Sequence, residues 1–288
     1  MNFYLTAFLL GLSLSVIAMG IFISMKIFNI PDITTDGSYT LGAVITAICL
    51  SHGYPLWLTY LLAVFGGALA GSITGFIHTK LKINALLAGI LVMTALYSVN
   101  LSLLGRSNLP LLNVRNIFQS LSFISDIDRN TFFILLVITT LLWVGLSLML
   151  KTDFGLAMRA TGNSESMIKA LGVDTDRMKI IGLAISNGLV ATSGFLVAQY
   201  QGFADINMGI GIVIVGLGSV MIGEAISHWF NISSIWINIL LVIAGSIAFQ
   251  VVLAFTLSLG IDANLLKLIT ALFVLFIVSL PNLSFRKN

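Results

Sequence analysis

Long runs of apolar residues separated by short polar loops dominate the pattern of this chain. A helix needs about 20 apolar residues to cross the hydrocarbon core of a bilayer. The last candidate run qualifies if Lys267 extends its amine toward an interface. The predicted spans are residues 3–25, 55–77, 83–104, 131–150, 180–200, 235–259 and 263–280.

Two further apolar segments are shorter and rich in small residues. Residues 38–50 contain 13 uncharged residues, and residues 208–222 contain 15 before Glu224 interrupts the run. Short, glycine-interrupted segments in transporters mark broken or half-crossing helices, but a tilted full span fits each segment equally well. The pattern therefore predicts an all-α, polytopic transmembrane helical bundle of about 8–9 spans. It includes one or two short or broken helices and forms a single domain over residues 1–288.

Charged residues gather in one loop, residues 151–179, which holds nine of them, five basic. Because Lys and Arg are enriched in cytoplasmic loops, we expect this loop and the C-terminal tail to face the cytoplasm. Alternation then places residues 105–130 and 201–207 outside. The side of the N-terminus stays open, because it depends on whether residues 38–50 cross fully.

Composition excludes several classes of protein. Only 9% of the residues are charged, against about 25% in soluble domains. The single Cys49 and three separated histidines leave no metal-binding set, and no basic run with aromatics indicates nucleic acid. No Gly-x-x-x-x-Gly spacing is followed by Lys and Ser or Thr, as a phosphate loop requires. We expect neither an enzyme nor a bound cofactor.

The loop of residues 151–179 contains two predicted helices, 154–161 and 164–171. Asn163 or Ser164 is the expected N-cap of the second, and Gly172 is expected to end it. A short amphipathic helix at a cytoplasmic mouth suits docking in a groove of a partner, although a solvated connector fits the composition as well. The apolar face consists of Met167, Ile168, Ala170 and Leu171.

The same loop carries the most specific motif of the chain. It contains Gly155-Leu-Ala-Met-Arg-Ala-Thr-Gly-Asn and then Ala170-Leu-Gly-Val, and the next span reads Ile185-Ser-Asn-Gly-Leu-Val-Ala-Thr-Ser-Gly-Phe-Leu-Val-Ala. These segments resemble the cytoplasmic loop of ABC transporter permeases of the branched-chain amino acid and ribose type. Leu41-Gly-Ala and Ala68-Leu-Ala-Gly-Ser-Ile-Thr-Gly agree with that family, so the resemblance covers essentially the full length.

The resemblance implies the membrane-spanning permease subunit of an ABC-type importer, a multi-pass protein of the bacterial inner (cell) membrane. It implies three partners besides the lipid bilayer: a separate ATP-binding ABC subunit, an extracytoplasmic substrate-binding protein and a second copy in a homodimer. Coupling to the ATPase is expected through Gly155, Arg159, Asn163, Met167, Ala170, Leu171 and Gly172.

One departure from the family concerns the solute. Many members have Asn-x-Ala-His-Gly before the second helix, where this chain reads Asn29-Ile-Pro-Asp-Ile-Thr-Thr-Asp-Gly. With Ile83-Asn-Ala-Leu-Leu-Ala-Gly-Ile-Leu and Gly105-Arg-Ser-Asn, this variant is similar to a less characterised subgroup associated with aromatic and other amino acids. We expect a small solute, an amino acid or related carboxylate.

Polar residues in the predicted spans are candidates for the lining of the solute pathway. Such groups are costly unless they are paired or line a wet cavity, and hydrogen bonding between helices explains any one of them as simply. The candidates are Asp36, Asn100, Asn187, Gln199, Glu224 and Gln250.

Two of these candidates carry specific expectations. Asp36 is the expected N-cap of the second helix, whose exposed start would favour an anionic group. Glu224 is expected to pair with a loop cation or to gate the exit. An ion-coupled secondary transporter is the alternative function, but it predicts ionisable residues at the bilayer centre, and the predicted spans hold few. A non-transporting scaffold would not need a docking loop.

Overall fold

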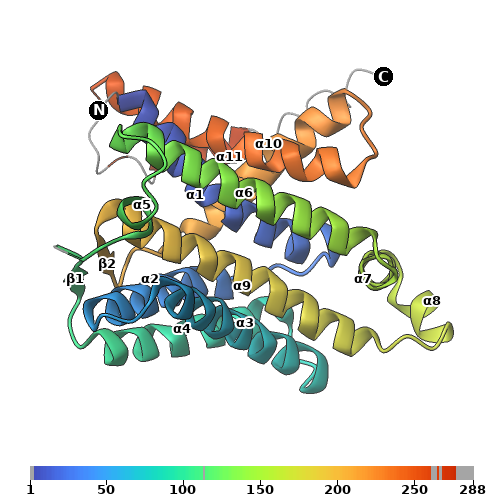
Figure 1. Ribbon diagram of the computed structural model, residues 1–288. Helices are drawn as coiled ribbons and strands as arrows, with labels where there is room; N and C mark the ends of the chain where they lie inside the picture. The colour runs from blue at the N-terminus through green and yellow to red at the C-terminus, as the bar shows by residue number, and fades with distance from the viewer. Residues whose placement is uncertain (1–2, 113, 261–264, 266–267, 277–288) are drawn as a thin grey trace.

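A computed structural model describes residues 3–112, 114–260, 265 and 268–276 of the protein, almost all of them in helices lying side by side in one bundle (Figure 1). The all-α fold expected from the apolar pattern is confirmed. In chain order the elements are α1 (Phe3–Ile21), the π-helix η1 (Phe22–Ile27), α2 (Thr34–Ser51), α3 (Leu56–Lys80), α4 (Ala85–Leu104), β1 (Asn108–Pro110), α5 (Ile117–Ser120), α6 (Ile127–Lys151), α7 (Asp153–Asn163), α8 (Glu165–Ala170), α9 (Thr175–Gln201), β2 (Phe203–Asp205), α10 (Ile212–Trp229) and α11 (Ile235–Ser258).

Seven of the described helices are long and apolar enough to cross a membrane. They are α1 continued by η1, α3, α4, α6, α9, α10 and α11. The predicted span of residues 263–280 lies partly outside the described residues, and its part 268–276 is helical. The total of about 8–9 spans stays a prediction.

Neither of the two short segments is broken. Helices α2 and α10 are each continuous over 18 residues, about 27 Å of helix. Helix α2 is buried along most of its length, so its polar residues face protein. The irregular backbone lies at the end of the first span instead, where η1 carries the chain toward α2.

The loops occupy the two ends of the bundle as the alternating map requires. Strands β1 and β2 pair antiparallel, with Asn108 opposite Asp205, and lie with α5 at one end. Helices α7 and α8 lie at the opposite end (Figure 1). The start of α1 lies at the β-strand end, where the Phe8 ring packs 5.8 Å from the ring of Phe132 at the start of α6.

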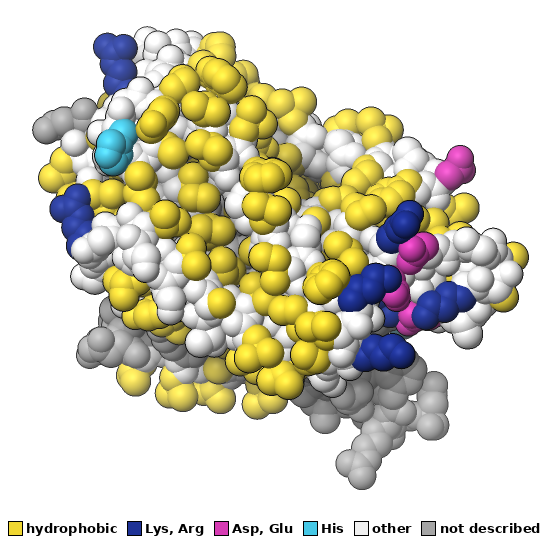
Figure 2. Space-filling view, turned by 90° about the horizontal axis from the view of Figure 1, so that it is seen from below, with side chains coloured by type: hydrophobic (Ala, Val, Ile, Leu, Met, Phe, Trp, Pro, Cys, Tyr) yellow, Lys and Arg dark blue, Asp and Glu magenta, His cyan; other side chains and the backbone are white. Residues whose placement is uncertain are grey.

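A hydrophobic belt covers the face formed by α3 and α4. Figure 2 shows hydrophobic side chains across this face, with the charged groups gathered toward its opposite ends. On α3, Phe65, Leu69 and Ile73 are about half exposed. An apolar belt between charged ends is the arrangement that a bilayer selects.

Helix α9 lies at the centre of the bundle and packs closely on α3. A Cβ atom at Gly71 would lie 2.1 Å from the carbonyl oxygen of Leu183, and one at Gly67 would lie 2.4 Å from that of Asn187. Only glycine permits the two backbones to approach this closely, because any side chain would overlap the facing carbonyl. Close packing of this kind helps to hold membrane helices together, since lipid supplies little hydrophobic drive for their association.

Helix α1 is clasped by serine hydroxyl groups from two later helices. Ser186 and Ser193 of α9 each donate a hydrogen bond of 2.7 Å to a backbone carbonyl of α1, and Ser246 of α11 donates one of 3.0 Å. The accepting carbonyls are those of Gly20, Ser13 and Gly11, respectively.

Candidate functional site

The loop between α6 and α9 folds against the end of the bundle as α7 and α8. Thr152 caps α7, its Oγ1 accepting a 3.3 Å hydrogen bond from the amide of Gly155. A Cβ atom on Gly155 would lie 2.4 Å from Leu150 Cα, so only glycine fits there. Met158 is fully buried. These contacts hold α7 firmly against the membrane helices.

The far end of α7 contacts the end of η1. A Cβ atom on Gly162 would lie 1.6 Å from the carbonyl oxygen of Ile27, and Asn29 Nδ2 donates to the carbonyl of Gly162 over 3.3 Å. Because the two backbones touch, a displacement of α7 acts directly on the segment that leads into α2.

Glu165 ties α8 to the start of α9. Its carboxylate lies 2.8 Å from Lys169 Nζ and 2.5 Å from Lys179 Nζ. The hydrogen bonds from Lys169 and Lys179 lower the pKa of Glu165 to about 2. Glu165 is therefore ionised at neutral pH.

The predicted apolar face of α8 is divided in the structure. Ile168 is buried against the bundle, whereas Met167 and Leu171 are 64% and 69% exposed, and Ala170 is exposed too. Gly172 has φ of +84° and ends the helix, as predicted. Met167, Ala170 and Leu171 form the exposed apolar surface called the α8 patch below.

Two other predicted coupling residues lie on α7. Arg159 is half-buried, and its guanidinium forms no hydrogen bond or ion pair within the described part of the chain. Arg159 therefore has no side-chain partner among those residues, and its expected role in coupling to the ATPase stays a prediction. Asn163 ends α7 and is exposed, and Ser164 takes the N-cap position of α8.

A buried carboxylate, which the sequence reasoning missed, lies inside the bundle. Asp32 is 4% exposed. One oxygen accepts a 2.7 Å hydrogen bond from Asn187 Nδ2, and the other accepts a 2.9 Å bond from the amide of Thr34. Ser38 Oγ donates to Asn187 Oδ1 over 2.7 Å. The cluster ties the start of α2 to the middle of α9.

A local signal could have identified Asp32. Asp32 lies two residues before Thr34, where α2 begins, and an aspartate at that spacing is a typical capping residue for the first free amides. The sequence makes Asn187 a candidate for the lining of the solute pathway, with hydrogen bonding between helices as the alternative. Its amide group bonds to both α2 and the segment before it, so the alternative fits its surroundings.

The prediction that Asp36 caps α2 is wrong. The N-cap of α2 is Ile33, and Asp36 lies in the first turn. The Asp36 carboxylate instead accepts hydrogen bonds from the amides of Gly211, at 3.0 Å, and Val213, at 2.8 Å. The fold brings the first turn of α2 against the start of α10, so the amides at the start of α10 bind the protein's own carboxylate.

Asp36 and Asn100 line one cavity of about 350 Å³ between α2, α4 and residues 206–210, called the α2–α4 cavity below. Asn100 is 1% exposed, and its Nδ2 donates a long, 3.3 Å bond to the carbonyl of Gly37. Its Oδ1 accepts no hydrogen bond from any described residue. An unsatisfied buried acceptor costs about 1–3 kcal/mol, so the site favours a ligand or water that donates.

Helix α4 turns polar groups outward beside this cavity. Thr94, Tyr97 and Ser98 are exposed and share one face at i, i+3 and i+4 spacing. Most other outward residues of α4, such as Leu87 and Leu101, are apolar, as are most of those of α3. Thr94, Tyr97 and Ser98 thus interrupt a largely apolar outward face, and at that place such polar groups favour contact with water or protein.

The other three pathway candidates lie elsewhere. Gln199 Oε1 accepts a 2.8 Å hydrogen bond from the amide of Ile117 and so holds α5. Gln250 borders a cavity of about 430 Å³ beside β2. Glu224 pairs with Lys26 Nζ at 2.8 Å. The expected cation partner of Glu224 is thus present, but it comes from η1 rather than a loop.

Comparisons with known proteins agree with this geometry. The sequence pattern of the family described as the branched-chain amino acid transport system permease component matches residues 3–279. A tyrosine transport system permease protein of Clostridioides difficile (strain R20291) is 39% identical over 274 residues, 95% of this chain and 90% of that protein. An autoinducer 2 import system permease protein of Photorhabdus laumondii is 27% identical over 219 residues, 73% of this chain and 62% of that protein.

The fold is shared with a solved structure of different sequence. PsaBC from Streptococcus pneumoniae in complex with Fab matches with a TM-score of 0.53 and 15% identity, over 96% of this chain and 89% of that one. At this identity the likeness shows the fold alone. The family pattern, however, covers nearly the whole chain. The protein therefore belongs to the family of branched-chain amino acid transport permeases, multi-pass membrane components of ABC transporters rather than enzymes.

Proposed function

We propose that the chain is the membrane-spanning subunit of an ABC-type importer for an amino acid in the bacterial inner membrane, with L-tyrosine as the first substrate to test. The observation that carries this proposal is the α2–α4 cavity, a mainly apolar hollow at membrane depth into which a few polar groups, among them Asp36 and Asn100, project. The relative from C. difficile, named for tyrosine transport, supports the substrate class.

The chemistry of the α2–α4 cavity suits an ammonium group. The cavity offers two acceptors, the partly buried Asp36 carboxylate and the buried Asn100 Oδ1. Tyr97 and Met93 line the same cavity and offer an aromatic and a thioether surface to a side chain. The expected anchor on the solute is thus its ammonium rather than its carboxylate, because Asp36 already occupies the start of α10.

A second copy of the chain would complete the pathway. The outward Thr94, Tyr97 and Ser98 need a protein or water surface opposite them. A two-fold homodimer that faces α4 toward its copy supplies one and places both α2–α4 cavities along a common channel. The substrate-binding protein would then approach the β1–β2 end, and the ATPase would contact the α8 patch at the other end.

The contacts suggest how ATPase motion reaches the solute. A displacement of the α8 patch moves α7, whose Gly162 touches Ile27 at the end of η1. The chain continues through Asp32, bonded to α9, and into the turn that carries Asp36 to the α2–α4 cavity. The route is a series of packed backbones and hydrogen bonds from the docking surface to the solute.

The proposal is tested with Ala170→Glu, which places a charge in the α8 patch outside the membrane helices. We expect loss of the co-purifying ATPase and of L-tyrosine uptake, with unchanged membrane insertion. Ser234→Glu, also exposed but at the start of α11, is the matched control and should retain both. Normal uptake with an intact complex in Ala170→Glu would show that the loop is a mere connector. Uptake driven by an ion gradient without ATP would favour the secondary transporter instead.

A further inference from the structure

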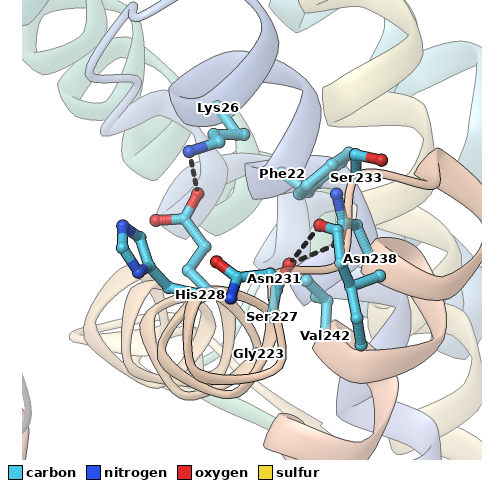
Figure 3. A pocket seen from close by; sticks show the side chains of 11 residues that line it. Phe22, Lys26, Gly223, Ser227, His228, Asn231, Ser233, Asn238 and Val242 are labelled. Carbon is cyan, nitrogen blue, oxygen red and sulfur yellow. Dashed lines mark hydrogen bonds and ion pairs between the residues drawn. The ribbon is translucent and has the colours of Figure 1, made fainter.

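A second cavity, with charged and polar side chains in its lining, lies at the end of the bundle that carries α7. It has a volume of about 380 Å³, within the range of small-molecule sites, about 300–1,000 Å³. It opens between η1, α10 and α11 (Figure 3). Lys26 on its rim adjoins Ile27, which touches Gly162 of α7. The cavity is therefore next to the coupling loop and separate from the α2–α4 cavity.

Two opposite charges stand side by side on this rim. Lys26 Nζ lies 2.8 Å from Glu224 Oε1, and the two side chains are 54% and 29% exposed. Glu224 Oε1 is buried, and no well-aligned hydrogen bond from a described residue reaches it. A cation and an anion at this spacing are complementary to the carboxylate and ammonium of one zwitterion.

The remaining lining offers donors and an apolar wall. Ser227 Oγ lies 2.6 Å from the Asn238 amide group and 3.0 Å from the carbonyl oxygen of Ile232, so the Ser227 and Asn238 side chains are hydrogen-bonded to each other on the cavity wall. The Asn231 side chain makes no hydrogen bond within the described residues and lies in the same view (Figure 3). Phe22 and Val242, both buried, form the apolar side.

We propose that the Lys26–Glu224 cavity binds the head group of a free α-amino acid from the cytoplasm, and that its occupancy slows further import. The ligand carboxylate binds Lys26 and its ammonium binds Glu224. The ligand's apolar part faces Phe22 and Val242. The direct ion pair between η1 and α10 thereby becomes a bridged one, which holds the two helices in a different separation beside the α7 contact. This inference rests on the proposed function, because the accumulating product is the ligand.

The test uses the whole complex, with ATPase and binding protein, in proteoliposomes whose lumen is the cytoplasmic side and holds ATP. Initial uptake of labelled L-tyrosine is measured with the lumen empty of amino acid or loaded with unlabelled L-tyrosine, tyramine or N-acetyl-L-tyrosine. Tyramine lacks the carboxylate, and N-acetyl-L-tyrosine lacks the ammonium. We expect lumenal L-tyrosine to reduce uptake at least about fivefold, and the two analogues to have no comparable effect.

The variants Glu224→Gln and Lys26→Met should lose this inhibition. The measured quantity is the ratio of uptake without and with lumenal L-tyrosine, so a changed basal rate does not affect it. Asp176→Asn is the matched control, because the Lys80–Asp176 pair has nearly the same length, 2.9 Å, and exposure, 46% and 29%, on other helices. This control should keep the wild-type ratio.

Three results overturn parts of the scheme in distinguishable ways. If both cavity variants are still inhibited by lumenal L-tyrosine, the inhibition arises in the transport pathway, and the inference is overturned. Normal import without lumenal inhibition in the wild type overturns it too. No import of L-tyrosine at all overturns the proposed function. Titration of L-tyrosine into the permease and ATPase in nanodiscs, without the binding protein, then counts the sites; one site fewer in Glu224→Gln than in the wild type supports the cavity, and equal binding refutes it.

Discussion

The most apolar 18-residue stretches of α9 and α4 have nearly equal mean hydropathy, yet they occupy opposite environments. Within α9, 72% of the span is buried inside the protein, against 28% within α4. Small residues and hydroxyl groups of α9 contact α1, α2 and α3 at backbone distance, whereas α4 exposes Tyr97 and its polar neighbours. Apolar character therefore identifies a membrane span but does not show what surrounds it. The small and polar residues within the span determine whether its neighbours are protein or lipid.

The largest effect should come from filling the α3–α9 contact. Gly71→Ala places a Cβ atom 2.1 Å from the Leu183 carbonyl, and we expect it to destabilise the protein by about 3 kcal/mol or more. Gly145→Ala on α6 makes the same chemical change where no atom lies within 4 Å. It should be neutral or stabilise by about 0.5–1 kcal/mol through helix propensity. Thermal unfolding in detergent measures both, and equal midpoints would contradict the packing argument.

The next effect compares two buried asparagines. Asn187→Leu on α9 removes the donor to Asp32 and the acceptor of Ser38, and should destabilise by about 2 kcal/mol. Asn100→Leu on α4 removes one long bond and an unsatisfied acceptor, so it should alter stability by less than about 1 kcal/mol while reducing uptake. Unfolding midpoints and transport, measured on both variants, separate the two roles. The reverse ranking would break the comparison.

A smaller effect should distinguish the two outward faces. Tyr97→Ala removes an exposed aromatic ring beside the α2–α4 cavity. If the ring contributes about 1.4 kcal/mol of interaction with the solute, its loss lowers uptake about tenfold. Phe65→Ala removes an exposed ring of α3, 62% exposed, and should leave uptake near the wild-type value. Both variants should unfold near the wild-type temperature. If Phe65→Ala impairs uptake as much as Tyr97→Ala, the pathway does not follow α4.

The smallest effect concerns the exposed end of α9. Hydrogen bonds from Lys169 and Lys179 hold the Glu165 pKa at about 2, below its ordinary value of 4.5. Because the pKa is lowered, the ionised Glu165 stabilises the folded loop above about pH 4.5, and this stabilisation is lost as the pH falls toward 2. Glu165→Gln should therefore increase pepsin cleavage of residues 151–179 near pH 4.5, with the difference vanishing toward pH 2. Because the ion pairs of Glu165 are partly exposed, we expect them to stabilise the loop by less than about 1 kcal/mol. A difference that grows on acidification would contradict it.

Much of the fold could be predicted because bilayer length and helix-ending residues act locally. The apolar runs located the spans within a few residues, and Gly172 ended α8 where expected. The glycines of α3 indicated a close helix contact, although not its partner. Each of these features depends on neighbours a few positions away in the chain.

The candidate site was only partly predictable, because its contacts depend on remote segments. Asp36 has the local sequence of a capping residue for its own helix, yet its bonds are to amides 175 and 177 positions later. Ile168 belongs to the same apolar face as Met167 and Leu171, and only the packed bundle decides which of them is covered. Tyr97 lies within an apolar run and has no local signal that separates a pathway face from a lipid face.

The serine clasp on α1 has a consequence for synthesis of the chain. Helix α1 emerges first from the ribosome, but the donor that bonds Gly11 is Ser246, 235 positions later. At about 5–20 residues per second, this donor follows on the order of 10–50 s behind. Throughout that interval α1 lacks its α11 donor, and its two α9 donors follow only 166 and 180 positions after the carbonyls that they bond. Completion of the bundle is thus a late event, in which the last helices fold back onto the oldest one.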